Sequence, residues 1–395
     1  MIDAVILVGG KGTRLGVLTK NTPKPLLKIN NQVFLDALLS KLLKYNFKKI
    51  YLICSFKKEK FFNLYHNKIL HNSKIICIDE GYPKGTGGAL YKIKNFIKKD
   101  FILINGDTYF DIDISKIIET KFRNNICTIA LTKNNKKVSN HKINNIIINK
   151  KNILQFSKEK SNLMNGGVYF FKQKFFKLIV KKECSLEDDI LKNLINNKRI
   201  HGIFFKEKFI DIGSHNTIKF LKKNKNFLKQ KVVFLDRDGV INKLRKNDYV
   251  KNFSEFKFLP TVSNAINYIK DNDYLVIIIT NQACVGKSII TEKALNSIHS
   301  KMQKYLKLKS NACVDDIFFS PYYRYSINSK YRNNIFDRKP NPGMLIKAIN
   351  KWNIYKERSF FIGDSLTDYE TAKKLKIKFY YKNNTNLYNQ IKKII

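Results

Sequence analysis

The chain has few cysteines and no long apolar run. Its six cysteines stand at positions 54, 77, 127, 184, 284 and 313, with no CxxC and no paired spacing. Isolated thiols argue against a disulfide framework and favour a reducing cytoplasm. No apolar run approaches the length needed to cross a bilayer, so no membrane partner is expected. The first residues, MIDAVILVGG, lack a basic segment, and we expect a first strand there instead of a signal peptide.

Acidic residues are also scarce. The chain has 31 Asp and Glu against 75 Lys and Arg, a formal charge of +44. Such an excess suits nucleic-acid binding, because lysine and arginine neutralise phosphates. The lysines, however, spread over the whole chain, and Asn, Ile, Phe and Tyr are abundant with them, a group with A/T-rich codons. Genomic bias is therefore the preferred interpretation, and a basic RNA-binding protein on an enzyme scaffold is the alternative from another class.

The length of 395 residues suits two or three domains, and 44% hydrophobic residues can form real cores. Short apolar runs that suit strands alternate with helical patterns such as residues 32–45 and 291–306. Such alternation predicts an α/β protein with two Rossmann-like, three-layer domains and mainly parallel sheets. A charged, polar stretch follows Phe220 and interrupts the pattern. We therefore expect domains at residues 1–222 and 231–395, joined by a linker at 223–230.

A glycine-rich turn follows the first predicted strand directly. It comprises Gly9, Gly10, Lys11, Gly12, Thr13 and Arg14, and continues as LGVLTKNTPKPLLKI. Glycines let backbone N–H groups approach phosphate oxygens, yet the pattern fits neither GxxxxGK[ST] nor GxGxxG. The extended pattern resembles the sugar-1-phosphate nucleotidyltransferases. In that family a sugar phosphate oxygen attacks the α-phosphorus of a nucleoside triphosphate, so the resemblance implies that Arg14 and Lys24 face the triphosphate and catalyse its reaction.

Further motifs of the first half extend this resemblance over residues 1 to about 222. By resemblance, Asp107 after FILIN and Asp211 in FIDIGS are the two magnesium ligands. The nucleotide-binding loop GYPKGTGGAL contributes Gly85, Thr86 and Gly88, and the sugar-facing segments contribute Glu159, Lys160, Asn165 and Gly166. Within the family, these segments look most like the D-glycero-D-manno-heptose-1-phosphate guanylyltransferases, which implies GTP as the nucleotide. Enzymes acting on mannose 1-phosphate and glucose 1-phosphate share most of the pattern, and this alternative stays open.

The second half opens with two aspartates at a predicted strand end, in FLDRDGV. This pattern resembles the first motif of the haloacid dehalogenase (HAD) phosphatases, and the other three motifs follow in order with Thr280, Lys339 and Asp364. The resemblance implies that Asp236 is the nucleophile, that Asp238 is the general acid and base, and that Thr280 and Lys339 stabilise the transferring phosphoryl group. Magnesium would be held by Asp236, Asp238 and Asp364. Asp368 is equally well explained as a carboxylate at a helix N-terminus.

The intervals between these motifs leave no room for a large cap domain, so a capless HAD-like fold is expected. The surrounding sequence is similar to the D-glycero-D-manno-heptose-1,7-bisphosphate 7-phosphatases, and histidinol phosphatases share much of it. The resemblance implies substrate contacts from Asn281, Arg338 and Lys339, with Arg338 as the anchor for the second phosphate. That family's zinc loop has no thiolate or imidazole here, since its positions hold Ser320, Tyr322, Ile335 and Asp337. No zinc is therefore expected.

The two resemblances fit one reaction sequence. A heptose 1,7-bisphosphate would lose its 7-phosphate, and the remaining 1-phosphate would react with GTP to give GDP-heptose. The expected partners are thus small molecules, GTP and heptose phosphates, with magnesium at both sites. The alternative is a nucleotidyltransferase for mannose or another hexose, fused to a phosphatase of different specificity. The sequence leaves the nucleobase, the anomer and the oligomeric state open.

Overall fold

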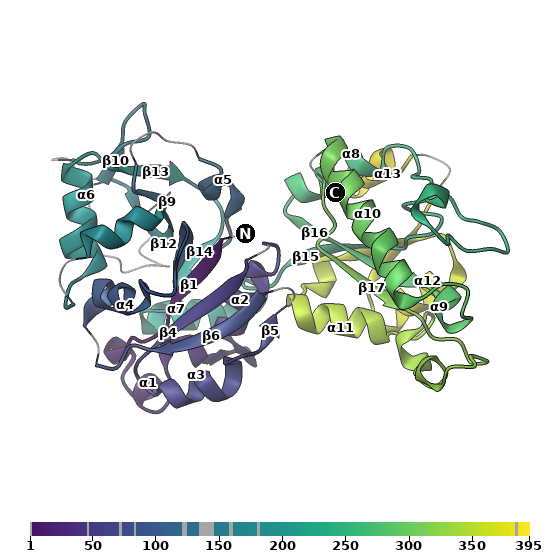
Figure 1. Ribbon diagram of the computed structural model, residues 1–395, viewed down its shortest axis with the longest axis horizontal. Coiled ribbons are helices and arrows are strands. Elements are labelled where there is room, and N and C mark those ends of the chain that lie inside the picture. Colours follow the sequence, from purple (N-terminus) through teal and green to yellow (C-terminus); the bar gives the residue numbers. More distant parts are fainter. Residues whose placement is uncertain are drawn as a thin grey trace. The chain divides into compact units, whose positions relative to one another are not determined.

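The computed structural model describes residues 2–45, 47–70, 73–82, 84–120, 125–133, 146–157, 161–179, 182–310, 312–383 and 386–395. The chain divides into two compact units, Met1–Phe227 and Leu228–Ile395. Each unit is built from strands and helices in alternation (Figure 1). The predicted α/β class with mainly parallel sheets is confirmed.

The described residues of the first unit form one large mixed sheet and two small ones. Its strands are β1 (Asp3–Leu7), β2 (Lys28–Ile29), β3 (Gln32–Val33), β4 (Lys49–Cys54), β5 (Ile69–Leu70), β6 (Ser73–Asp79), β7 (Phe101–Asn105), β8 (Thr108–Phe110), β9 (Cys127–Lys133), β10 (Ile146–Ile148), β11 (Leu154–Phe156), β12 (Leu163–Phe171), β13 (Ile200–Phe204) and β14 (Phe209–Asp211). Its helices are α1 (Val17–Lys20), α2 (Phe34–Leu42), α3 (Lys58–Tyr65), α4 (Gly85–Ile93), α5 (Ser115–Ile118), α6 (Lys192–Asn196) and α7 (His215–Lys223). Short 3-10 helices are η1 (Thr13–Leu15), η2 (Lys24–Leu26) and η3 (Gln173–Leu178), and η4 (Leu186–Leu191) is a π-helix.

The centre of the large sheet is parallel. β1 pairs with β4 and β7, and β4 pairs with β6, all in the parallel sense. β12 joins β7 and β9 in the antiparallel sense. Alternate residues of β1 enter two different cores, with Ala4 and Ile6 on the side of α2 and Val5 on the side of α4. Burial on both faces explains why β1 is apolar throughout.

A small two-stranded antiparallel sheet places Asp211, one of the predicted metal ligands. β8 pairs with β14, and this register sets Thr108 opposite Asp211. The buried ammonium group of Lys41, from α2, donates to the carbonyl oxygen of Phe110 at the end of β8. It also lies 3.4 Å from a carboxylate oxygen of Asp111. Burial lowers the pKa of Lys41 to about 8, against the opposing effect of Asp111.

The second unit has a five-stranded parallel sheet in its described residues, in the order β17-β16-β15-β18-β19. Its strands are β15 (Lys231–Leu235), β16 (Tyr274–Asn281), β17 (Asp316–Ser320), β18 (Phe360–Gly363) and β19 (Lys378–Tyr381). Its helices are α8 (Val262–Asp271), α9 (Ala283–Gly286), α10 (Glu292–Ser310), α11 (Gly343–Trp352), α12 (Leu366–Lys374) and α13 (Leu387–Ile394), with turns η5 (Phe253–Glu255), η6 (Ser329–Tyr331), η7 (Ile335–Asp337) and η8 (Lys356–Arg358).

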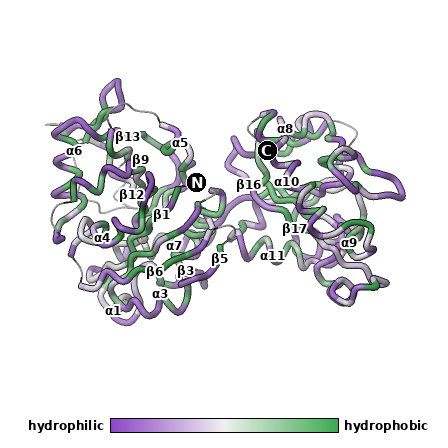
Figure 2. Tube along the Cα trace, in the orientation of Figure 1, coloured by the Kyte–Doolittle hydropathy of each residue, from purple (hydrophilic) through white to green (hydrophobic). Residues whose placement is uncertain are grey.

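Helices cover both faces of this sheet. Side chains of α8, α10 and α13 form one core with Val233 and Leu235 of β15. On the other face α11 packs against β16 and β17, and α12 packs against β18 and β19. Figure 2 shows the result, with hydrophobic residues concentrated on the central strands of each unit. In the described part of the chain, no helix combines the length and apolar character needed to span a membrane.

Lys41 gives a pH-dependent prediction for the first unit. Its folded pKa of about 8 lies below the ordinary 10.5, so the unfolded chain binds more protons between these values. The free energy of unfolding should therefore rise with pH across this window, by on the order of 3 kcal/mol. Calorimetry of the whole chain should show this rise in wild type and in the exposed control Lys48→Met, but not in Lys41→Met. Parallel pH curves for all three proteins would contradict this account.

Candidate active sites

The glycine-rich turn of the first unit connects β1 to η1. Gly12 has a positive φ of 66°, which favours glycine, and its carbonyl oxygen accepts a hydrogen bond from the Thr19 hydroxyl at 2.9 Å. Gly10 has neither a positive φ nor a neighbour within 4 Å of a Cβ built there. Among the described residues, neither the backbone conformation nor the packing requires glycine at this position. The space beside Gly10 is open enough for a ligand to approach the backbone closely.

Lys24 and the two predicted metal ligands lie close together. The Lys24 ammonium group contacts a carboxylate oxygen of Asp107 at 2.5 Å, and Lys24 is 9% exposed. Asp211 ends β14 beside Asp107, because Ile212 donates its backbone N–H to the Asp107 carbonyl at 3.0 Å. Carboxylates bind metals through oxygen atoms, so the side chains of these two aspartates suit a hard cation such as magnesium. Thr13 and Arg14 are exposed on η1.

The other predicted nucleotide-binding and sugar-binding residues contact the rest of the unit. Thr86 donates to Glu187 at 2.7 Å and accepts from the Leu186 N–H at 2.8 Å. A Cβ at Gly85 would lie 2.4 Å from the Cys184 carbonyl oxygen, and one at Gly88 would lie 2.5 Å from that of Lys182. These glycines therefore permit close packing of α4 against the segment before η4.

On β12, the Asn165 amide donates to the Tyr169 hydroxyl at 2.7 Å. Gly166 packs against the Phe110 ring, since a Cβ there would lie 2.4 Å from a ring carbon. Glu159 and Lys160 lie outside the described residues. Sequence reasoning missed Glu80, whose carboxylate lies against Gly9 and whose pKa burial raises to about 7.

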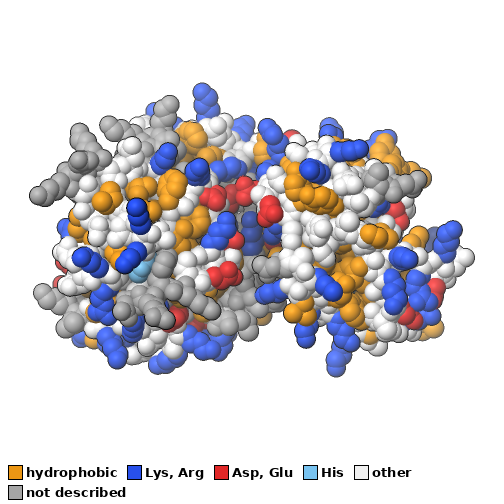
Figure 3. Space-filling model, turned by 90° about the horizontal axis from the view of Figure 1, so that it is seen from above, with side chains coloured by type: hydrophobic (Ala, Val, Ile, Leu, Met, Phe, Trp, Pro, Cys, Tyr) orange, Lys and Arg blue, Asp and Glu red, His pale blue; other side chains and the backbone are white. Residues whose placement is uncertain are grey.

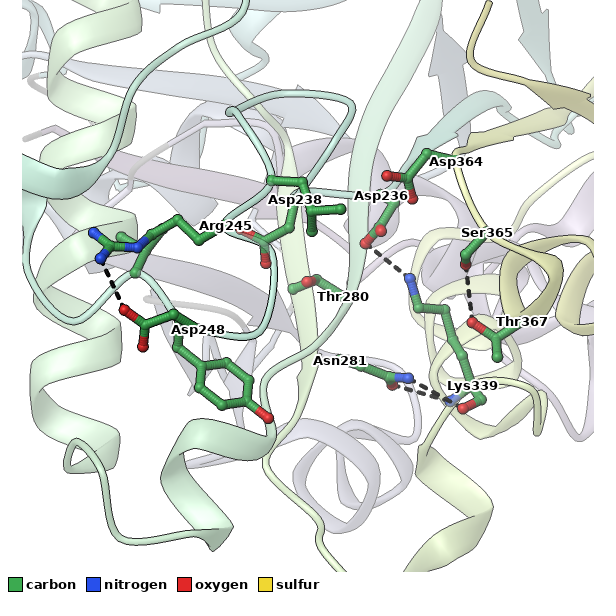
Figure 4. A pocket seen from close by; sticks show the side chains of 13 residues that line it. Asp236, Asp238, Arg245, Asp248, Thr280, Asn281, Lys339, Asp364, Ser365 and Thr367 are labelled. Carbon is green, nitrogen blue, oxygen red and sulfur yellow. Dashed lines mark hydrogen bonds and ion pairs between the residues drawn. The ribbon is translucent and has the colours of Figure 1, made fainter.

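The site of the second unit lies at the carboxyl ends of three neighbouring strands. Asp236 follows β15, Thr280 and Asn281 end β16, and Asp364 follows β18. The pairing of β15 with β16 and β18 brings these ends to one edge of the sheet. They surround a cavity of about 330 Å³, which is also lined by Asp238, Leu244, Arg245, Asp248, Tyr249, Val250, Lys339, Ser365 and Thr367. Figure 4 shows the side chains around it.

Lys339 is a buried cation that lines this cavity. Its ammonium group lies 2.8 Å from Asp236 Oδ1 and 2.5 Å from Asp368 Oδ1, and it donates to the Ile279 carbonyl at 3.0 Å. Burial alone lowers the pKa of Lys339, but the two carboxylates outweigh it, and the pKa is raised. The Asn281 side chain fixes the backbone of Lys339, accepting from its N–H at 3.0 Å and donating to its carbonyl at 3.1 Å.

The carboxylates of Asp236, Asp364 and Asp368 have oxygen atoms within 4.8 Å of one another. Burial raises the pKa of Asp236 to about 7, and the nearby Asp368 charge adds to this while Lys339 opposes it. The all-oxygen donor set fits magnesium. Asp368 also forms a capping box with Ser365 at the start of α12. It is therefore also a carboxylate at a helix N-terminus, as one of the two interpretations of the sequence expected. Asp364 lies against Gly239, whose φ is 88° and where a Cβ would meet the Asp364 carboxylate.

Asp238 is held by polar side chains that the sequence did not single out for this purpose. Its carboxylate accepts from Arg237, from Asn242 at 2.8 Å and from Gln282 at 2.7 Å. Burial alone raises the Asp238 pKa, but Arg237 and the amide donors outweigh it, and the pKa is lowered. A charged residue between two motif aspartates was the signal that could have indicated the role of Arg237.

Arg338 does not line the cavity, and it donates to the Tyr322 carbonyl at 3.2 Å. The positions that correspond to the zinc loop make other contacts. Ser320 accepts the Gln282 N–H through its carbonyl at 2.7 Å, and Asp337 pairs with Lys347. Ile335 is exposed. Hydrogen bonds within the segment order it, such as Tyr323 N–H to the Tyr331 carbonyl at 2.9 Å.

Comparison with known proteins separates the two units. The nucleotidyl transferase family model matches residues 3–230, and the polynucleotide kinase 3 phosphatase family model matches residues 231–385. The bifunctional protein GlmU of Methanococcus aeolicus is 37% identical over 224 residues, which cover 54% of this chain and 51% of that protein. The chain thus spans about half the length of the GlmU proteins that it matches.

Two further relatives each match one unit over most of their own length. The D-glycero-alpha-D-manno-heptose 1-phosphate guanylyltransferase of Campylobacter jejuni is 31% identical over 215 residues, covering 54% of this chain and 95% of that protein. The D-glycero-beta-D-manno-heptose-1,7-bisphosphate 7-phosphatase of Rhodopseudomonas palustris is 36% identical over 140 residues, covering 35% of this chain and 76% of that protein. The chain therefore belongs to the nucleotidyl transferase family, and a HAD-like phosphatase domain follows in the same polypeptide.

Proposed function

We propose that the chain carries out two consecutive reactions of nucleotide-activated heptose synthesis. The second unit removes the 7-phosphate from D-glycero-D-manno-heptose 1,7-bisphosphate, and the first unit transfers GMP from GTP to the heptose 1-phosphate. The observation that carries the proposal is the agreement between units. One is similar to a heptose-1-phosphate guanylyltransferase over 95% of that protein, and the other is similar to a heptose-bisphosphate 7-phosphatase over 76% of that protein.

In the first unit, a phosphate oxygen of the sugar attacks the α-phosphorus of GTP, and the bond to the leaving pyrophosphate breaks. The turn at Gly10 leaves room for the triphosphate, while Arg14 and Lys24 neutralise its charge. Asp107 and Asp211 would hold magnesium, which screens the phosphate charge when bound. Lys24 is paired with Asp107 in the structure without nucleotide. The ammonium group and the carboxylate are therefore in place before the nucleotide binds.

In the second unit, an Asp236 oxygen attacks the phosphorus, and the bond to the sugar oxygen breaks as Asp238 gives that oxygen a proton. Asp238 then takes a proton from water, whose oxygen attacks the phosphorus and releases Asp236 and inorganic phosphate. Lys339 and Thr280 stabilise the charge on the phosphoryl oxygens. Asp236 and Asp364 would hold magnesium, together with the Asp238 carbonyl that the family resemblance implies, and the metal neutralises the same oxygens when bound.

The cavity also indicates which side chain contacts the second phosphate of a bisphosphate. Lys339 and Arg245 are the cationic residues among those that line it. Lys339 is committed to Asp236 and Asp368 at the reacting end. Arg245 contacts Asp248 at 2.8 Å and Glu255 at 2.9 Å, and a guanidinium with five N–H groups keeps donors for a ligand. Arg245 therefore takes the role that the sequence suggested for Arg338.

The two reactions should be separable by mutation. Asp236→Asn should lower phosphate release from the bisphosphate by about three orders of magnitude or more, because it removes the nucleophile. The same variant should release pyrophosphate from heptose 1-phosphate and GTP at the wild-type rate. Asp107→Asn should show the reverse pattern. Loss of both reactions in either folded variant would contradict the two-site account.

Arg245→Ala should discriminate between substrates with one phosphate and with two. Loss of a charge-assisted hydrogen bond should raise KM for heptose 1,7-bisphosphate about tenfold or more, with a much smaller change for heptose 7-phosphate. Lys251→Ala is the matched control, because Lys251 pairs with the same Asp248 at 3.1 Å but does not line the cavity. An equal rise in KM for both substrates would show that Arg245 does not contact the second phosphate.

Nucleotide choice tests the guanylyltransferase part. Buried groups that hydrogen-bond a base edge reject a mismatched base strongly, so kcat/KM for GTP should exceed that for ATP by about a hundredfold or more. Steady-state rates with GTP, ATP, CTP and UTP, each with heptose 1-phosphate and with mannose 1-phosphate, measure both preferences. Equal turnover of mannose 1-phosphate would remove the heptose assignment and leave nucleotidyl transfer intact.

A further inference from the structure

Arg237 is an almost fully buried guanidinium next to the two motif aspartates. It is 1% exposed. Its Nη2 donates to both carboxylate oxygens of Asp238, at 3.0 and 2.9 Å, and its Nη1 lies 3.1 Å from His299 Nε2. Its Nε has no hydrogen-bond partner among the described residues. Because a buried charge is costly unless it is paired, Asp238 and His299 together account for the placement of this side chain.

His299 comes from α10, far along the chain from the two aspartates. It is 5% exposed and shares the buried face of α10 with Leu295, Ile298 and Met302. Burial lowers the pKa of His299 to about 3, and the Arg237 charge adds to this. The Nε2 atom of the neutral ring can therefore accept a hydrogen bond from Arg237 Nη1. An apolar residue at this position would leave Nη1 without its acceptor.

The donors around Asp238 restrict its carboxylate to one orientation. Arg237 approaches both oxygens, Asn242 approaches Oδ1 and Gln282 approaches Oδ2. A carboxylate has about four acceptor positions, and these four hydrogen bonds match that number, so they hold the group in place. The Asp238 side chain is 23% exposed, and it lines the cavity. The exposed part of the carboxyl group thus borders the space where the substrate's leaving oxygen must lie.

We propose that His299 and Arg237 are positioning residues for the phosphatase reaction, which hold the Asp238 carboxyl so that its cavity-facing oxygen meets the leaving-group oxygen. His299 fixes one end of the guanidinium, and the other end of the guanidinium fixes the carboxyl. The inference rests on the proposed role of Asp238 as proton donor. It does not depend on which sugar phosphate is the substrate.

A series of aryl phosphates tests the inference without knowledge of the natural substrate. p-Nitrophenyl phosphate has a good leaving group that needs little protonation, whereas phenyl phosphate has a poor one. A displaced Asp238 should therefore slow phenyl phosphate more. In the whole chain with magnesium, His299→Asn should lower kcat/KM for phenyl phosphate about tenfold or more beyond any fall for p-nitrophenyl phosphate.

The matched variant is His299→Gln. Its amide oxygen reaches about as far as Nε2, while the shorter Asn of the same chemistry does not, so Gln should restore most of the wild-type ratio. Turnover of p-nitrophenyl phosphate shows that the site is folded in each variant. If His299→Asn does not fold, His299→Leu and Arg237→Lys replace it, with the same steeper dependence on the leaving group expected.

Asp238→Asn separates this inference from the proposed function. If it fails to steepen the leaving-group dependence, Asp238 is not the proton donor, and the proposed mechanism falls with the inference. If Asp238→Asn steepens the leaving-group dependence but His299→Asn lowers kcat/KM equally for all aryl phosphates, only the inference is overturned. A shallower dependence in His299→Asn also overturns it, since Arg237 would then act by keeping Asp238 ionised.

Discussion

Both sites depend on a buried lysine ammonium placed against an aspartate that comes after a strand with a parallel neighbour. In the first unit Lys24 meets Asp107, and in the second Lys339 meets Asp236. Carboxylates gathered at one edge of a sheet repel one another, and burial adds to the cost. The lysine offsets both effects, and in the proposed reactions it supplies the positive charge that a phosphoryl group needs. A further aspartate lies close to each pair, Asp211 in the first unit and Asp368 in the second.

The strand-end positions of the site residues could be predicted from the sequence, because the carboxyl ends of neighbouring parallel strands lie at the same edge of a sheet. Apolar runs give the strands, and the residues that follow them share one edge of the sheet. Asp236, Thr280 and Asp364 are placed together by this rule alone. Lys339 is in a loop before α11, and only the motif resemblance indicated that it reaches the same cavity.

The residues that sequence reasoning missed depend on side-chain packing between distant elements. His299 lies on an amphipathic helix, and nothing in the local sequence shows that α10 brings it to Arg237. Arg245 and Arg338 are both arginines near motifs, and only the fold separates the one that lines the cavity from the one that donates to Tyr322. Basic residues are scattered over the face seen in Figure 3, so charge alone singles out neither.

The central claim is that the product of one unit is the substrate of the other. The named relatives differ in anomer, with alpha in the guanylyltransferase and beta in the phosphatase. The direct measurement incubates the whole chain with GTP, magnesium and either anomer of heptose 1,7-bisphosphate, while phosphate and pyrophosphate are followed separately. The account predicts that one anomer gives phosphate first and then an equal amount of pyrophosphate with GDP-heptose. Phosphate release from both anomers without any pyrophosphate would contradict it.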